Sequence, residues 1–204
     1  MTQAESLYRE LLKRYGPPKG QWILWCRRPK TKKQREEVAI GAILTQRVNW
    51  DNVQKAIDNL KKEGLCSFGG IYELAQKDLS LLAERIRPSG FYNQKAERLF
   101  DFVKVVKKRY KDVLGMKGAE KRVLRDEPIE IKGLGEETVD DILLYSLDFP
   151  CFVIDEYTRR FVQRRKLCNN LSYRFLQRFF ENQLPEDFKI YQDLHALIII
   201  DEKC

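Results

Sequence analysis

The chain has 204 residues, enough for one compact domain or two small lobes to bury a hydrophobic core without disulfide or metal support. Its 38 Lys and Arg residues outnumber the 30 Asp and Glu residues, and the net charge of +8 favours a polyanionic partner without identifying one. No apolar run approaches the roughly 18 residues that cross a bilayer, so we expect no membrane partner.

Helical periodicity extends through most of the sequence, and no segment shows the polar and apolar alternation that is typical of a strand. The first predicted helix has Leu7 and Leu11 on one face and ends at Gly16. This helix is charged and amphipathic rather than a signal peptide, so we expect an intracellular, cytoplasmic protein. Further helices are predicted around residues 38–44, 53–60, 70–77, 78–87, 96–106, 119–125, 135–148, 156–167, 172–183 and 186–200. The sequence therefore predicts an all-α fold of about ten helices.

Two segments are predicted to be extended or loose. One is the basic stretch 27–33, and the other is 149–154, where the apolar run after Pro150 is too short for a helix. We interpret both segments as candidate boundaries between lobes.

The sequence IKGLGEETV, residues 131–139, places a Gly-x-Gly turn directly before a predicted helix. Such a turn leaves backbone N–H groups unpaired at the helix start, and its glycines let a phosphate come close to the backbone. The loop can therefore hold a phosphodiester without reading base sequence. A simple connection between two helices is the alternative interpretation of the turn on its own.

Asp155 follows the apolar run 152–154 and stands immediately before the predicted basic helix 156–167. An aspartate in this position commonly caps the helix N-terminus. A fixed carboxylate can also stabilise a developing positive charge and orient or deprotonate water. Both roles remain open for Asp155 at this point.

The hairpin and the downstream aspartate together resemble the helix-hairpin-helix DNA glycosylases, in which an L-P-G-V-G or L-P-G-I-G loop is followed by an aspartate at the mouth of the base pocket. Two further segments support the resemblance. GAILTQ and WDNVQKAI, residues 41–46 and 50–57, are similar to a signature of endonuclease III-related proteins, including the 3-methyladenine glycosylases of that branch. RPSGFYNQKA, residues 87–96, resembles the start of a helix in the same branch.

The resemblance implies two helical lobes with an active-site cleft between them. One lobe would comprise residues 1–29 and 148–204 and would carry the catalytic Asp155. The other would comprise residues 30–147 and end with the helix-hairpin-helix motif. The implied partner is double-stranded DNA that contains a damaged base, bound by a monomer, and the base is flipped out of the duplex before it is removed.

The resemblance also assigns roles to side chains outside the catalytic position. Gln46 would enter the duplex in place of the flipped base, although alone it reads as a polar residue at a helix end. The other expected DNA-binding residues lie in and after the hairpin: Lys132, Gly133, Leu134, Gly135 and Thr138. The expected base-pocket residues are Trp50, Trp25 and Trp22, with packing in the core as the alternative for each. His195, the only histidine, is interpreted as a packing residue on an apolar helix face.

Glu137 stands where bifunctional relatives carry the lysine that attacks the sugar, and a carboxylate cannot form a Schiff base. Alone, it reads as an exposed acid in a first helical turn. The resemblance therefore implies a monofunctional glycosylase that activates water.

The five cysteines are scattered and contain no C-x-x-C pair, so the sequence indicates no metal site. Many relatives bind a four-cysteine iron–sulfur cluster near the C-terminus, whereas this sequence could supply at most the first ligand, Cys204. We expect no cofactor unless the chain continues beyond Cys204.

Three functional hypotheses follow. The favoured one is a monofunctional glycosylase that removes an alkylated purine such as 3-methyladenine. The second is an endonuclease III-like glycosylase with abasic-site lyase activity on oxidised or mismatched bases, which would need a different lysine. The third is a DNA-binding protein without catalysis, which would leave Asp155 without a purpose.

Overall fold

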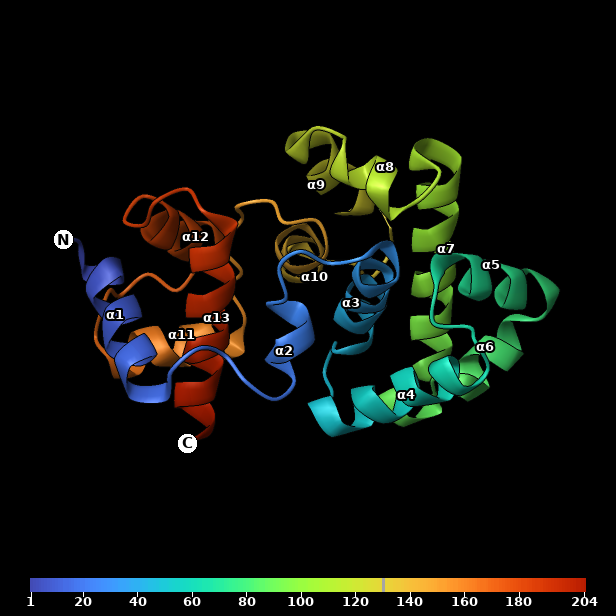
Figure 1. The fold of residues 1–204 in the computed structure, drawn as a ribbon, viewed down its shortest axis with the longest axis horizontal. Helices are drawn as coiled ribbons and strands as arrows, with labels where there is room; N and C mark the ends of the chain where they lie inside the picture. The colour runs from blue at the N-terminus through green and yellow to red at the C-terminus, as the bar shows by residue number, and fades with distance from the viewer. Residues whose placement is uncertain (130) are drawn as a thin grey trace. The chain divides into compact units, whose positions relative to one another are not determined.

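The computed structural model describes residues 1–129 and 131–204, with side chains for all of these except residues 126–129. These residues form thirteen α-helices, one 3-10 turn and one π-helical turn, with no strand among them (Figure 1). The predicted all-α fold is confirmed. The chain divides into two compact units, one of Met1–Arg28 with Leu143–Cys204 and the other of Pro29–Ile142.

The first unit combines both ends of the chain around a C-terminal helix. Helices α1 and α11 both pack against α13. Tyr15 on α1 and Arg164 on α11 both bind the Asp201 carboxylate on α13. The elements of this unit are α1 (Gln3–Tyr15), α2 (Trp22–Trp25), the π-helical turn η2 (Ile142–Ser146) from Leu143 onward, α11 (Glu156–Arg164), α12 (Tyr173–Glu181) and α13 (Phe188–Lys203).

The second unit is organised around the long helix α7. Helices α3, α5, α6 and α8 all pack against it. Helix α9 packs on α10, and Arg125 pairs with the buried Asp140 carboxylate at 3.0 Å. The elements are α3 (Lys32–Leu44), α4 (Trp50–Lys62), α5 (Phe68–Lys77), α6 (Leu79–Arg85), the 3-10 turn η1 (Arg87–Ser89), α7 (Tyr92–Tyr110), α8 (Val113–Lys117), α9 (Lys121–Ile129) and α10 (Glu136–Asp141).

The sequence prediction missed α2 and α8 because helices of 4 and 5 residues are too short to show a 3.6-residue period. It also extended the loose segment 27–33 too far. Thr31 caps α3 through a capping box with Gln34, so Lys32 and Lys33 are already helical. The single helix predicted for 135–148 is instead α10 followed by η2.

The predicted non-helical segment 149–154 is confirmed, and residues 151–154 lie in the core of the first unit. Helix α12 supplies hydrogen bonds that a strand would otherwise receive from a neighbouring strand. Gln177 Nε2 donates to the Phe152 carbonyl at 2.8 Å, and the Phe152 N–H donates to Glu181 Oε1 at 2.9 Å. The Phe152 ring stacks on Phe180 with centroids 4.3 Å apart. These contacts fix the backbone that leads into Asp155.

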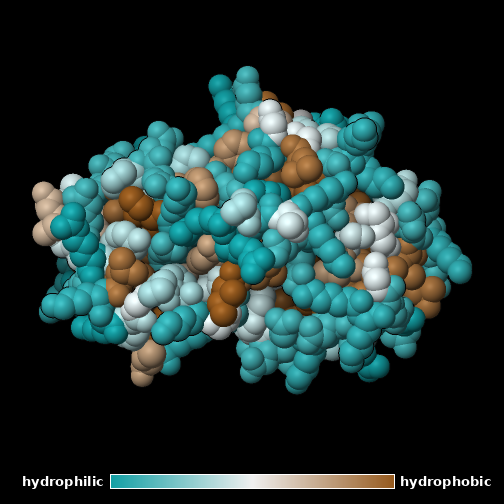
Figure 2. All heavy atoms as spheres, in the orientation of Figure 1, coloured by the Kyte–Doolittle hydropathy of each residue, from teal (hydrophilic) through white to brown (hydrophobic). Residues whose placement is uncertain are grey.

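In the part of the chain that the structure describes, no helix is long and apolar enough to span a membrane. Hydrophilic side chains cover most of the face shown in Figure 2.

We expect Gln177→Leu to lower the free energy of unfolding by about 1–3 kcal/mol, because the buried Phe152 carbonyl loses its donor. Urea denaturation measures the change. Gln163→Leu is the matched control, since Gln163 is exposed on α11 and should change stability by less than about 0.5 kcal/mol. Equal effects of the two substitutions would show that the Gln177 hydrogen bond does not hold the segment.

Candidate active site and nucleic-acid interface

Asp155 is the N-cap residue of α11, and its two carboxylate oxygens have different surroundings. Oδ1 accepts a hydrogen bond from the Thr158 N–H at 2.7 Å. Oδ2 lies 3.8 Å from His195 Nε2, within ion-pair reach but beyond hydrogen-bond distance. The Asp155 side chain is 15% exposed. Capping therefore occupies Oδ1 and leaves Oδ2 outside the cap, facing His195, so the two roles weighed for this residue are compatible.

The environment of Asp155 favours the charged carboxylate. Burial alone would raise the pKa of this carboxyl group, but His195 and the Thr158 N–H outweigh burial and hold the pKa below its ordinary value. Asp155 is therefore ionised at neutral pH. A buried carboxylate of this kind can stabilise a developing positive charge without first having to lose a proton.

His195 contributes to this site, although the sequence analysis had set it aside as a packing residue. It lies on α13 and is almost completely buried. Its Nδ1 is 2.7 Å from the Tyr145 hydroxyl, which also donates to the Gln192 carbonyl at 3.2 Å. These contacts fix the imidazole ring so that Nε2 faces Asp155.

Trp22 and Trp25 lie in the same unit as Asp155 and pack around Tyr145. Their ring centroids are 5.7 and 5.1 Å from that of Tyr145, and Trp22 is 6.2 Å from the His195 ring. Both tryptophans are buried. They hold the Tyr145–His195 pair in place, and their assignment to a base pocket remains a prediction. Trp50 belongs to the second unit, where it begins α4 and is half-buried.

The hairpin is a tight turn in which the Leu134 N–H donates to the Ile131 carbonyl at 3.0 Å. Gly133 has φ of +90°, a conformation that favours glycine. Lys132 and Gly135 are exposed, whereas the side chains of Leu134 and Thr138 are buried. Leu134 can therefore offer a ligand only its backbone. Glu137 is exposed in the first turn of α10, as expected.

Gln46 is joined to the hairpin by hydrogen bonds from both ends of its amide. Nε2 donates to the Gly133 carbonyl and to Thr138 Oγ1, each at 2.9 Å, and Oε1 accepts from Arg98 Nη1 at 2.6 Å. The structure thus brings three of the expected DNA-binding residues together. Sequence reasoning missed Arg98, which carries no local signal because its partner is 52 residues away.

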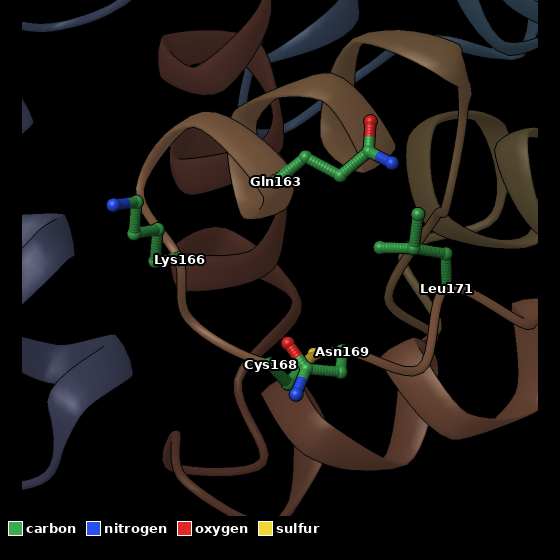
Figure 3. Close-up of a pocket in the computed structure, with 5 residues that line it drawn as sticks. All are labelled: Gln163, Lys166, Cys168, Asn169 and Leu171. Carbon is green, nitrogen blue, oxygen red and sulfur yellow. The ribbon is translucent and has the colours of Figure 1, made fainter.

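A separate hollow of about 410 Å³ lies in the first unit and contains neither Asp155 nor an aromatic side chain (Figure 3). It is lined by Gln163, Lys166, Cys168, Asn169 and Leu171. We assign it no function. Among the described residues, no group of three or more His, Cys, Asp or Glu side chains could hold a metal ion. The expectation of no cofactor stays a prediction.

Comparison with known proteins places the chain in a family. The sequence model of the HhH-GPD superfamily of base excision DNA repair proteins matches residues 40–186. A candidate DNA repair glycosylase of Methanocaldococcus jannaschii is 44% identical over 168 residues, which cover 81% of this chain and 75% of the relative. This chain belongs to the HhH-GPD superfamily of base excision DNA repair proteins. It is a DNA repair glycosylase, and its partner is DNA.

Two further comparisons bear on the kind of glycosylase. The crystal structure of the H. pylori 3-methyladenine DNA glycosylase MagIII bound to 1,N6-ethenoadenine superposes with a TM-score of 0.79 at 27% identity, and covers 98% of this chain and 95% of that one. Endonuclease III of Thermotoga maritima is 24% identical over 185 residues, which cover 90% of this chain and 76% of the relative. The two relatives therefore belong to different kinds of glycosylase.

Gly135 offers a clean test of phosphate binding at the hairpin. A Cβ at Gly135 would meet no atom within 4 Å, whereas one at Gly133 would lie 2.1 Å from Arg98 Nε. We expect Gly135→Ala to leave thermal stability unchanged and to weaken duplex binding by about 1.5–3 kcal/mol, the contribution of a hydrogen bond to a charged group. Fluorescence anisotropy measures the affinity.

Gly69→Ala on α5 is the control, because a Cβ there also has ordinary space, and it should leave DNA binding unchanged. If Gly135→Ala bound the duplex with wild-type affinity, the result would contradict the prediction that this turn binds a phosphate.

We expect His195→Gln to shift the acidic limb of the pH–rate profile for base release to higher pH. The substitution removes the imidazole that lowers the pKa of Asp155, so burial then dominates and Asp155 takes up a proton at a higher pH. Single-turnover base release between about pH 4 and 8 measures the shift. Tyr145→Phe keeps the imidazole and should shift the limb less. A uniform loss of rate at every pH would mean that His195 only packs.

Proposed function

We propose that this glycosylase is monofunctional and acts as a monomer on double-stranded DNA, where it flips out an alkylated purine such as 3-methyladenine and hydrolyses its N-glycosidic bond. The observation that carries this proposal is the ionised, largely buried Asp155 carboxylate with one oxygen free of the helix cap. Such a group is suited to a reaction in which positive charge develops on a sugar.

Cleavage of an N-glycosidic bond gives the sugar oxocarbenium character as the base leaves with the bonding electrons. Asp155 Oδ2 would stabilise this charge electrostatically and accept a proton from the water that attacks C1′. Oδ1 remains bonded to the Thr158 N–H, which fixes the direction of the carboxylate. The products are the free base and an abasic sugar in an intact strand.

The absence of an amine at residue 137 supports hydrolysis over lyase chemistry. Glu137 stands at the position of the family's nucleophilic lysine, is exposed, and cannot form a Schiff base. Another lysine would have to supply the amine in a bifunctional enzyme.

Support for an alkylated purine comes from the similarity to a 3-methyladenine glycosylase and from the tryptophans. A cationic alkylated purine gains stacking and cation–π attraction from an electron-rich indole ring. Trp50, Trp25 and Trp22 are the proposed base-pocket residues. Gln46 is the proposed residue that fills the space left by the flipped base.

The alternative function is an endonuclease III-like glycosylase with lyase activity on oxidised or mismatched bases. The similarity to the Thermotoga maritima endonuclease III favours it. The two functions differ in their products, because a lyase cuts the strand and forms a covalent intermediate that borohydride traps.

We expect the wild-type protein to release free base from a duplex that contains 3-methyladenine, while the strand stays uncut and borohydride traps no adduct. Asp155→Asn keeps a capping oxygen but loses the charge, so it should fold, bind DNA normally and lose at least about 100-fold in base release. Chromatography of the released base and denaturing gels measure these outcomes. The same assay should also be run on duplexes that contain 1,N6-ethenoadenine or an oxidised pyrimidine.

Asp187→Asn is the matched control, since Asp187 also caps a helix, α13, by accepting a hydrogen bond from the Lys189 N–H at 2.8 Å. It should retain full activity. If Asp155→Asn released base at the wild-type rate, Asp155 would serve only as a helix cap. Efficient borohydride trapping of the wild type would favour the lyase.

A further inference from the structure

Arg98 on α7 is a half-buried arginine whose hydrogen-bond partners are neutral. Nη1 donates to Gln46 Oε1 at 2.6 Å, and Nη2 donates to Gln94 Oε1 at 3.4 Å. Among the side chains that the structure describes, those of residues 1–125 and 131–204, Arg98 forms no ion pair with a carboxylate. Two amides therefore hold a guanidinium group in a defined place without neutralising it.

A second cation lies one helical turn away. The buried Lys95 ammonium donates to the Leu44 carbonyl at 2.8 Å and to the Ser89 carbonyl at 2.5 Å. Burial lowers the pKa of Lys95 to about 8, and the charge of Arg98 contributes to this lowering. Two like charges one helical turn apart repel each other, and an anion that bound here would relieve the repulsion.

Arg98 also lies directly against the hairpin. A Cβ at Gly133 would be 2.1 Å from Nε, 2.6 Å from Cζ and 2.8 Å from Nη2 of Arg98. The same turn exposes the backbone of Gly133 and the side chain of Lys132. The guanidinium group is therefore placed beside backbone to which a phosphate can come close, in a conformation that favours glycine at residue 133.

We propose that Arg98 binds a DNA phosphate beside the hairpin, and that Gln46 holds its guanidinium group in place until DNA binds. A guanidinium group can give a phosphate two parallel hydrogen bonds, which the neutral amides do not match in strength. When the Gln46 side chain leaves to enter the duplex, Nη1 of Arg98 loses its partner and becomes available to the phosphate. Base flipping and backbone binding are thereby coupled through one side chain. The coupling rests on the proposed role of Gln46, whereas the phosphate contact requires only that the protein binds DNA.

The competing explanation is that Arg98 only orients Gln46. The two explanations differ in how binding depends on salt, because each phosphate that a cation neutralises contributes about 0.9 to the slope of log K against log salt concentration. A purely orienting arginine would change affinity and leave this slope unchanged.

The experiment measures the affinity of the full-length protein for an undamaged duplex over a range of salt concentrations. Arg98→Gln should lower the slope by about 0.9 relative to the wild type, and Arg98→Lys should retain the wild-type slope. Lys108→Gln is the control, since it removes an exposed charge from the same helix, roughly 15 Å further along. It should leave the slope unchanged. Equal slopes for wild type and Arg98→Gln, or equal reductions in Arg98→Gln and Lys108→Gln, would overturn the proposal.

Circular dichroism establishes whether Arg98→Gln is folded. If it is not, the test moves to Gln46→Ala, in which Arg98 has already lost its Gln46 partner. In this variant, NMR follows the Arg98 Nε–H resonance, which is assigned by its loss when Arg98→Lys is added. We expect the resonance to shift when duplex is added and to return to its original position at high salt. No shift would overturn the proposal. Base release plays no part in either measurement, so a failure of the proposed glycosylase chemistry would remain distinguishable.

Discussion

A carboxylate that stays charged while largely buried is the constraint on which the site depends. An isolated buried charge costs several kcal/mol, so Asp155 requires compensating partners on both oxygens. The start of α11 provides the Thr158 N–H, and α13 provides His195. His195 is in turn fixed by Tyr145 from the π-helical turn. The non-helical segment before Asp155 can lie in the core because α12 satisfies the backbone of Phe152.

In the second unit, an amide side chain has a comparable organising role. Gln46 follows the end of α3 and connects it to the hairpin through Gly133 and Thr138. Lys95 stabilises the same helix end by donating to the Leu44 carbonyl, which is favourable because positive charge complements a helix C-terminus. The residues that resemble the family's signature are therefore linked to one another within the fold. Their spacing in the sequence reflects these contacts within the protein.

Local signals in the sequence predicted most of the fold and part of the site. Capping residues and apolar periodicity were sufficient for the long helices, and the Gly-x-Gly turn and Asp155 each follow from a few adjacent residues. His195 and Arg98 could not be predicted in this way. Their partners lie 50 residues away at Tyr145 and 52 residues away at Gln46, and only the packing of whole helices brings them together. Because local sequence does not show contacts between distant residues, His195 was predicted to be an ordinary core residue.

The proposed reaction depends on the charge of Asp155, because a protonated carboxyl group could neither stabilise a sugar cation nor accept a proton from water. The most direct measurement is the pH titration of the Asp155 side-chain carboxyl carbon by ¹³C NMR in the wild-type protein, with the resonance assigned by its loss on Asp155→Asn. We predict a titration midpoint below the ordinary value for aspartate. A midpoint above that value, with the carboxyl group protonated towards neutral pH, would contradict the account.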